Sequence, residues 1–258
     1  MNMTPRKSVN LHRVVRFLDG LLKPAVFKDW ENAVNGLQAE NSGTISKVAA
    51  SVDASLATIT KAIRSGADMM IVHHGLFWNP THPWTGPKYR LLKTLLDGNL
   101  AVYSAHLPLD AHPTLGNNAL LAKALGFHRC RPFYPEKGAH IGLQTDTRIG
   151  RVELQARLGK VLGNAPLLLP GGPEECRKIG IVTGGAGGGI GRAAAEGVDT
   201  FITGEGPHHT HALSEELGVN VFYGGHYLTE TFGVKALAAR VSRQFNVPWF
   251  FIDHPSGL

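Results

Sequence analysis

Two stretches of this chain alternate short apolar runs with helical patterns, and this alternation restricts the fold more than any other feature. Residues 67–72 form an apolar run interrupted only by Asp68, which suits a strand buried on both faces of a parallel sheet, and residues 198–203 are predicted to form a corresponding strand. Strands that alternate with helices favour a mainly parallel sheet covered by helices. We therefore predict an α/β fold of two pseudo-symmetric βαβ-type halves packed around a shared site.

The elements that we expect follow from apolar periodicity and from turn residues. Predicted helices cover residues 11–22, 56–65, 89–96, 115–125, 152–162, 190–196, 211–217 and 229–244. Predicted strands cover residues 36–39, 47–52, 67–72, 100–104, 139–144, 178–182, 198–203 and 219–223. The chain then divides into an N-terminal α/β half at residues 1–130, a connecting strand-helix region at 131–175 and a C-terminal α/β half at 176–258.

The two halves repeat a pattern at the ends of corresponding strands. Residues 66–74 and 197–205 share Gly-x-Asp, an apolar strand and then polar residues. Residues 105–110 and 225–230 each follow an apolar strand, and each contains His-x-x-x-carboxylate. In open α/β sheets, ligand-binding residues collect just beyond the carboxyl ends of strands, so we expect the two sets to meet.

Five residues at these strand ends are candidate metal ligands: His73, His74, Asp110, His226 and Glu230. Imidazole nitrogens and carboxylate oxygens bind Zn, Mn, Fe, Co or Ni, and the sequence does not choose among them. His226 and Glu230 are four residues apart, so both would lie on one face of a helix that begins at or before Tyr227. Either Asp110 or Glu230 could bridge two ions, because a carboxylate has two oxygens.

Two further residues are the repeat counterparts of candidate ligands. His106 corresponds to His226, and Glu205 corresponds to His74. We assign His106 and Glu205 to proton transfer or to support of the ligands. A nearby histidine cluster could line the entrance of the site or be solvated, and we prefer the solvated interpretation: His208, His209 and His211.

A glycine-rich segment at residues 182–191 contains G-x-G-x-x-G and resembles the nucleotide-binding turn of short-chain dehydrogenases. We reject that interpretation, because such enzymes need a Tyr-x-x-x-Lys pair downstream, whereas Tyr89 and Lys93 lie upstream. The glycines could still let a substrate phosphate approach a helix N-terminus. Trp78 and Trp84 could stack on a base.

Bulk composition sets limits on partners and location. The formal net charge is +6, with Lys and Arg scattered along the chain, so nucleic acid is possible but not the preferred partner. We expect no membrane association, because no apolar run approaches about 18 residues. Cys130 and Cys176 form no CxxC pair, which favours a reducing compartment, the cytoplasm.

These motifs together resemble the NIF-three-like family in its short bacterial form, whose members are often labelled GTP cyclohydrolase 1 type 2 homologs. The resemblance runs from the N-terminal region to the C-terminal helix. It is carried by Asn35-Gly36-Leu37-Gln38, His73-His74-Gly75, His106-x-x-Leu109-Asp110, Gly116-Asn117-Asn118, Thr203-Gly204-Glu205 and Gly225-His226-Tyr227-x-x-Glu230. One departure is Pro108, where the family often has a polar residue.

The resemblance implies a dinuclear centre with two divalent ions per subunit. His74, Asp110 and Glu230 would bind one ion, and His73, His226 and a shared Glu230 the other. It also implies a ring-shaped homohexamer and a metal-dependent hydrolase of the GTP cyclohydrolase 1 type 2 class, acting on a nucleotide or related phosphorylated heterocycle. The alternative is a non-catalytic metal-handling or nucleic-acid-associated ring protein.

Overall fold

The structure, a computed structural model, describes residues 8–77 and 83–258 and separates into two units. The first unit comprises Met1–Leu109 and Gly233–His254, and the second comprises Asp110–Phe232 and Pro255–Leu258. Trp78, a predicted stacking residue, lies outside the described residues. Within the described part of the chain, no helix combines the length and apolarity needed to cross a membrane.

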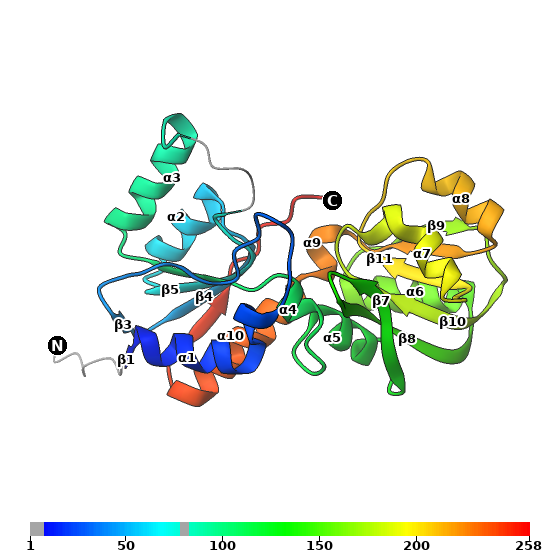
Figure 1. Cartoon of the computed structure of the whole chain (residues 1–258), viewed down its shortest axis with the longest axis horizontal. Helices are drawn as coiled ribbons and strands as arrows, with labels where there is room; N and C mark the ends of the chain where they lie inside the picture. The colour runs from blue at the N-terminus through cyan, green and yellow to red at the C-terminus, as the bar shows by residue number, and fades with distance from the viewer. Residues whose placement is uncertain (1–7, 78–82) are drawn as a thin grey trace. The chain divides into compact units, whose positions relative to one another are not determined.

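The first unit is built on a five-stranded sheet in the order β13-β4-β5-β6-β2. Neighbouring strands in it are parallel except β2, which pairs antiparallel with β6. In Figure 1, α2 and α3 cover one face of this sheet, and α1 and α10 cover the other. The elements are β1 (Val9–Asn10), α1 (Leu11–Leu22), η1 (Pro24–Val26), β2 (Gly36–Ala39), β3 (Thr44–Ile45), β4 (Val48–Asp53), α2 (Leu56–Arg64), β5 (Met69–His74), α3 (Gly86–Asp97), β6 (Ala101–Ser104), α4 (Leu107–Asp110), α10 (Thr231–Phe245) and β13 (Trp249–Phe251).

Local sequence explains where the first helices begin. The Asn10 side chain accepts a hydrogen bond from the backbone of Arg13 and caps α1, whose buried positions recur every three or four residues. Ser55 and Thr58 form a reciprocal capping box at the start of α2. Strand β5 is buried along its length until His74, so the apolar run of the sequence becomes a central strand.

The second unit contains a six-stranded sheet in the order β7-β8-β10-β11-β12-β9. Strands β10, β11 and β12 are parallel, and the other pairs are antiparallel. The elements are α5 (Asn117–Ala124), β7 (Cys130–Glu136), β8 (Ala139–Gly150), α6 (Arg151–Leu162), β9 (Leu167–Pro170), β10 (Glu175–Ile181), η2 (Ala186–Gly189), α7 (Ile190–Ala195), β11 (Thr200–Thr203), α8 (Thr210–Leu217), β12 (Asn220–Tyr223) and α9 (His226–Thr229).

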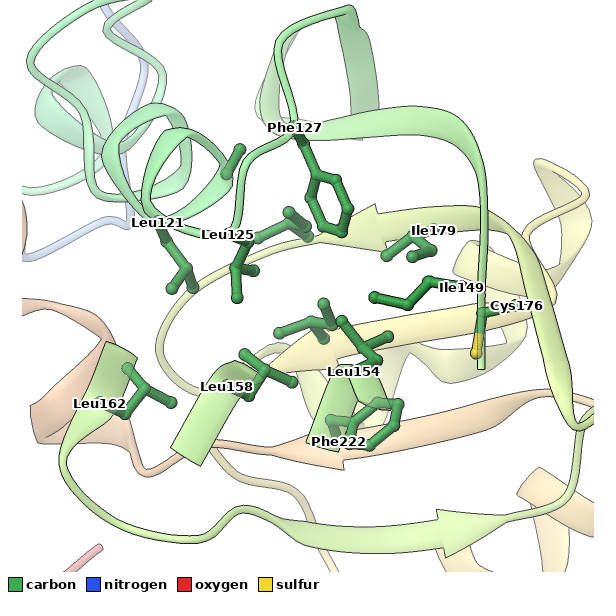
Figure 2. Close-up of a cluster of buried hydrophobic side chains, with 13 residues drawn as sticks. Leu121, Leu125, Phe127, Ile149, Leu154, Leu158, Leu162, Cys176, Ile179 and Phe222 are labelled. Carbon is green, nitrogen blue, oxygen red and sulfur yellow. The ribbon is translucent and has the colours of Figure 1, made fainter. Parts of the chain in front are cut away.

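Successive residues of strand β10 face opposite sides of the second sheet, and each side packs against different side chains. Figure 2 shows the cluster in which α5 and α6 pack their leucines against Ile179 and Phe222. On the opposite side of β10, the Phe133 ring occupies the space above Gly180, where a Cβ would lie 2.5 Å from the ring. The glycine therefore makes room for an aromatic side chain in a close-packed core.

The two sheets share a strand arrangement. Each contains three adjacent parallel strands with an antiparallel strand beside the third: β4-β5-β6 with β2, and β10-β11-β12 with β9. Strands β5 and β11, which carry the first pair of repeated segments, are the middle strands of these triplets. The fold is thus mixed α/β, with the repeated segments at corresponding positions.

The units have different boundaries from the ranges predicted from sequence. Residues 131–175 contribute β7, β8, α6 and β9 to the second sheet and its cover, because β8 pairs with β10 and β9 with β12. The helix predicted at 229–244 is observed as α10, and a separate short helix, α9, precedes it with Glu230 between the two. Helix α10 leads into β13, which pairs with β4 of the first unit.

Candidate metal centre

The carboxyl end of β5 presents two histidines in the first unit. His73 is fully buried, and its Nδ1 lies 2.8 Å from the backbone oxygen of Ala105. His74 is paired across the sheet with Asp53 at the end of β4, and its Nδ1 lies 2.8 Å from Asp53 Oδ1. Each ring is therefore oriented by an oxygen at a neighbouring strand end.

The third histidine of this unit, His106, follows β6 and is oriented by Asp29. Its Nδ1 lies 2.8 Å from Asp29 Oδ1, and the Asp29 side chain is only 4% exposed. Asn35 donates to Asp29 and accepts from the His106 backbone N–H, at 2.8 and 2.7 Å. Burial acts to raise the pKa of Asp29, but the hydrogen bonds and the charge of His106 hold it below its usual value.

The three rings of the first unit converge. The ring centroids of His73 and His74 are 4.9 Å apart, and those of His73 and His106 are 5.0 Å apart. One donor nitrogen from each residue lies within 4.8 Å of the other two. Three imidazoles at this spacing form a donor set of the kind that binds Zn, Fe, Co or Ni.

In the second unit, His226 lies between two carboxylates. Its Nε2 is 3.1 Å from Glu230 Oε2, and its Nδ1 is 2.8 Å from Glu205 Oε1. Burial acts to lower the pKa of His226, but Glu230 and Glu205 together raise it to about 9. Two ligands of one zinc ion also lie about 3 Å apart, so His226 and Glu230 have the spacing of a ligand pair.

Glycines at neighbouring strand ends make room for this pair. At Gly184, which has φ of +74°, a Cβ would lie 2.1 Å from Glu230 Oε1 and 3.4 Å from His226 Nε2. At Gly204, a Cβ would lie 2.7 Å from the Cα of His226. The backbone N–H groups of Gly204 and Glu205 both donate to the Gly184 carbonyl, which fixes the spacing of the two strand ends.

Asp110 belongs to the second unit and is held at the end of β10. Its Oδ1 accepts from Asn117 Nδ2 at 2.8 Å and from the Thr183 hydroxyl at 3.5 Å. The residue is 7% exposed and lines a cavity of about 120 Å³ whose rim includes His112 and His140. Asn117 and Thr183 thus fix the orientation of the Asp110 carboxylate.

Two observations indicate that these residues are suited to bind divalent ions. First, four histidines (His73, His74, His106 and His226) each place Nδ1 2.8 Å from an oxygen acceptor. A neutral ring that donates from Nδ1 carries its lone pair on Nε2, and metal-binding histidines are oriented in this way. Second, the Gly184 backbone forms a cradle beside Glu230 and His226 that any larger residue would fill.

Each unit brings some of the predicted residues together. His73 and His74 lie together with His106 in the first unit, and His226 lies with Glu230 and Glu205 in the second. Asp110 is held within the second unit by Asn117 and Thr183. His208, His209 and His211 are exposed, as the solvated interpretation expects.

Sequence reasoning missed the residues that hold the histidines. Asp53 could have been found, because it is a carboxylate that ends a strand beside the His73-His74 strand. Asp29 has no such signal, since it lies in an irregular segment before β2. Gln38 was noted only as part of a motif, but its Oε1 accepts from the backbone of Leu76 and secures the turn after His74.

The glycine-rich segment also has a packing role. Gly187 donates its backbone N–H to the Glu205 carbonyl at 3.0 Å, and a Cβ there would lie 2.5 Å from that oxygen. The segment therefore packs directly on the strand end that carries Glu205. Trp84, the other predicted stacking residue, is 59% exposed.

The fold and the donor groups define a class: an α/β protein with histidine and carboxylate clusters at its strand ends, suited to divalent metals. Residues 9–256 match the Duf34/NIF3 (NGG1p interacting factor 3) family, and the chain belongs to that family. The resemblance seen in the sequence motifs is thereby confirmed.

Relatives match over nearly the whole chain. A GTP cyclohydrolase 1 type 2 homolog from Deinococcus radiodurans is 41% identical, covering 100% of this chain and 98% of the relative. A protein of the same name from Archaeoglobus fulgidus is 40% identical over 97% of this chain and 100% of its own length. The crystal structure of TTHA1606 from Thermus thermophilus superposes with a TM-score of 0.86 at 40% identity, covering 97% of this chain and 100% of that one.

Proposed function

We propose that the chain assembles a dinuclear metal centre from His73, His74, Asp110, His226 and Glu230 and acts there as a metal-dependent hydrolase. The proposal unites the donor groups of the two units into one site, with the two units as related halves. Its substrate would be a nucleotide or a related phosphorylated heterocycle. The name shared by the relatives, GTP cyclohydrolase 1 type 2 homolog, makes GTP the first candidate.

The observation that carries the proposal is the orientation of the histidines. In each unit, Nδ1 of every candidate histidine is directed to an oxygen acceptor at 2.8 Å, so Nε2 is the metal-binding nitrogen. Structural histidines need no such common pattern. The repeated positions of these residues at strand ends explain why ligands far apart in sequence belong to one centre.

The residues of the chain have distinct tasks in this centre. His73, His74, Asp110, His226 and Glu230 would hold the ions, and the second oxygen of Glu230 makes it the shared ligand. Two divalent ions supply activation of a water and polarisation of the bond that it attacks. Glu205, hydrogen-bonded to His226, keeps that ring oriented and is placed to accept a proton there.

Two further expectations complete the proposal. The homohexameric ring would present six such centres, and sedimentation of the purified protein tests that assembly state. The cytoplasm remains the proposed location; Cys176 is buried, and both cysteines have free thiols. The positive net charge of +6 is favourable for a phosphorylated substrate.

The test is metal content and turnover measured on the same preparation. Protein purified without chelator should contain divalent metal by elemental analysis, and it should convert GTP or a member of a nucleotide panel. Glu230→Ala should lose metal and activity, whereas Glu215→Ala, an exposed change on α8, should keep both. Equal turnover by wild type and Glu230→Ala would refute the hydrolase; metal without turnover of any substrate would support the non-catalytic alternative.

A further inference from the structure

His106 stands outside the five proposed ligands, but its surroundings are those of a ligand. It follows β6 and is 8% exposed, so its imidazole is held within the protein. Its ring centroid lies 5.0 Å from that of His73 and 5.8 Å from that of His74. One ligand atom of its ring belongs to a group of three, with one atom each from His73 and His74, that lie within 4.8 Å of one another.

Asp29 determines which nitrogen of His106 can bind a metal. Four donors converge on the Asp29 carboxylate: the backbone N–H groups of Trp30 and Leu107, Asn35 Nδ2 and the His106 ring. An ionised carboxylate only accepts hydrogen bonds, so the ring must donate from Nδ1. The lone pair of neutral His106 is then on Nε2, as in a carboxylate–histidine–metal arrangement.

The same segment fixes the backbone beside the ring. Asn35 Oδ1 accepts from the His106 backbone N–H at 2.7 Å, and Asn35 Nδ2 donates to Asp29 Oδ2 at 2.8 Å. The main chain and the ring of His106 are thus restrained by the same pair of side chains. The fold has already restricted the conformations of the His106 side chain. Binding a metal would therefore cost this side chain little further conformational entropy.

We propose that His106 is a third imidazole ligand, bound to the ion held by His73, and that Asp29 is the residue that positions it. This inference rests on the proposed dinuclear centre and adds a donor to it. It replaces the role in proton transfer that the sequence repeat suggested for His106. The choice of the His73 ion follows from the shorter ring separation, 5.0 Å against 5.8 Å.

The test uses Co(II) with the full-length protein, because its visible absorption reports directly on the ligands. His106→Ala should bind the affected ion more weakly and change the visible spectrum, and added imidazole should restore the wild-type spectrum. Asp29→Asn should lower the affinity about 10- to 100-fold. An amide at residue 29 cannot accept from all four donors, so it releases the ring. His12→Ala and Asp97→Asn, both exposed changes in the first unit, serve as matched controls and should bind as wild type does.

The outcomes separate this inference from the proposed function. If wild-type protein binds no Co(II), the dinuclear centre fails and this inference fails with it. If wild type binds Co(II) and His106→Ala gives the same affinity and spectrum, only the ligand assignment is overturned. If Asp29→Asn lowers the melting temperature of the metal-free protein but leaves Co(II) affinity unchanged, Asp29 is structural and the positioning role is wrong.

Discussion

Replacing Gly184 with alanine should weaken metal binding in addition to its cost to the fold. Gly184 has φ of +74°, where a non-glycine residue costs about 1–2 kcal/mol. The added Cβ would lie 2.1 Å from Glu230 Oε1, and ordinary contact begins near 3.4 Å, so the oxygen must retreat by about 1.3 Å. The Glu230 side chain is 4% exposed, so it has little space in which to move. We expect the metal affinity to fall about 10- to 100-fold.

Gly218 offers the matched control. It has φ of +65° in the same unit, but a Cβ there meets nothing within 4 Å. Gly218→Ala should carry the same backbone cost of about 1–2 kcal/mol without touching a ligand. Isothermal titration with Zn(II) and thermal melting of the metal-free proteins separate the two effects. Equal Zn(II) affinities in the two variants would refute the inference that the Gly184 cradle shapes the metal site.

Three further predictions follow from the described contacts. Asp53→Asn should lower metal affinity about 10- to 100-fold by releasing the His74 ring, with little change in the melting temperature of the metal-free protein, because Asp53 is 43% exposed; unchanged affinity would remove its orienting role. Leu158→Ala should destabilise the second unit by about 2–5 kcal/mol in urea unfolding, whereas Leu217→Ala, 40% exposed, should cost far less; similar losses would contradict the assigned core. Chelation should lower the melting temperature, and added Zn(II) should restore it. At a free Zn(II) concentration of 100 times the dissociation constant, the added stability should be about 2.7 kcal/mol. A melting temperature that does not change with metal would argue against a site in the native state.

Central strands and their histidines were predictable from sequence because a strand buried on both faces must be apolar along its length. Strand β5 satisfies that condition up to Val72, so the polar pair His73-His74 at its end is conspicuous. Helix α1 was equally clear, because its apolar residues recur with helical period and its bounds coincide with the predicted ones.

The edge strand β7 was missed for a physical reason. Strand β7 contains Pro132 and Pro135, which lower strand propensity in any sequence-based prediction. The strand tolerates both because it lies at the edge of its sheet. It pairs with β8 as a hairpin across the two-residue turn of Lys137 and Gly138, both of which have positive φ.

The break between α9 and α10 was also invisible to periodicity. The helix predicted at 229–244 included Glu230, and the short helix α9 before it was not predicted. In the structure, the Thr229 hydroxyl donates to the carbonyls of Gly225 and His226, and Gly184 N–H donates back to that hydroxyl. These contacts close the short helix and leave Glu230 outside both helices, at the place where it meets His226.

The residues that orient the site show the limit of sequence reasoning most clearly. Metal ligands are limited to a few residue types and stand out by composition and spacing. A residue that orients a ligand needs only an acceptor oxygen, which any Asp, Glu or backbone carbonyl supplies. Asp29 was therefore indistinguishable from other surface acids until the fold brought it to His106.

The central claim is one dinuclear centre made from the donor groups of both units, and diffraction at the absorption edge of zinc tests it most directly. Crystals of the zinc-loaded protein should show two anomalous peaks per chain, about 3.5–4 Å apart. Both peaks should lie within bonding distance of Glu230, with His74 on one and His73 and His226 on the other. A single peak, or two peaks at separate clusters that share no ligand, would contradict the account.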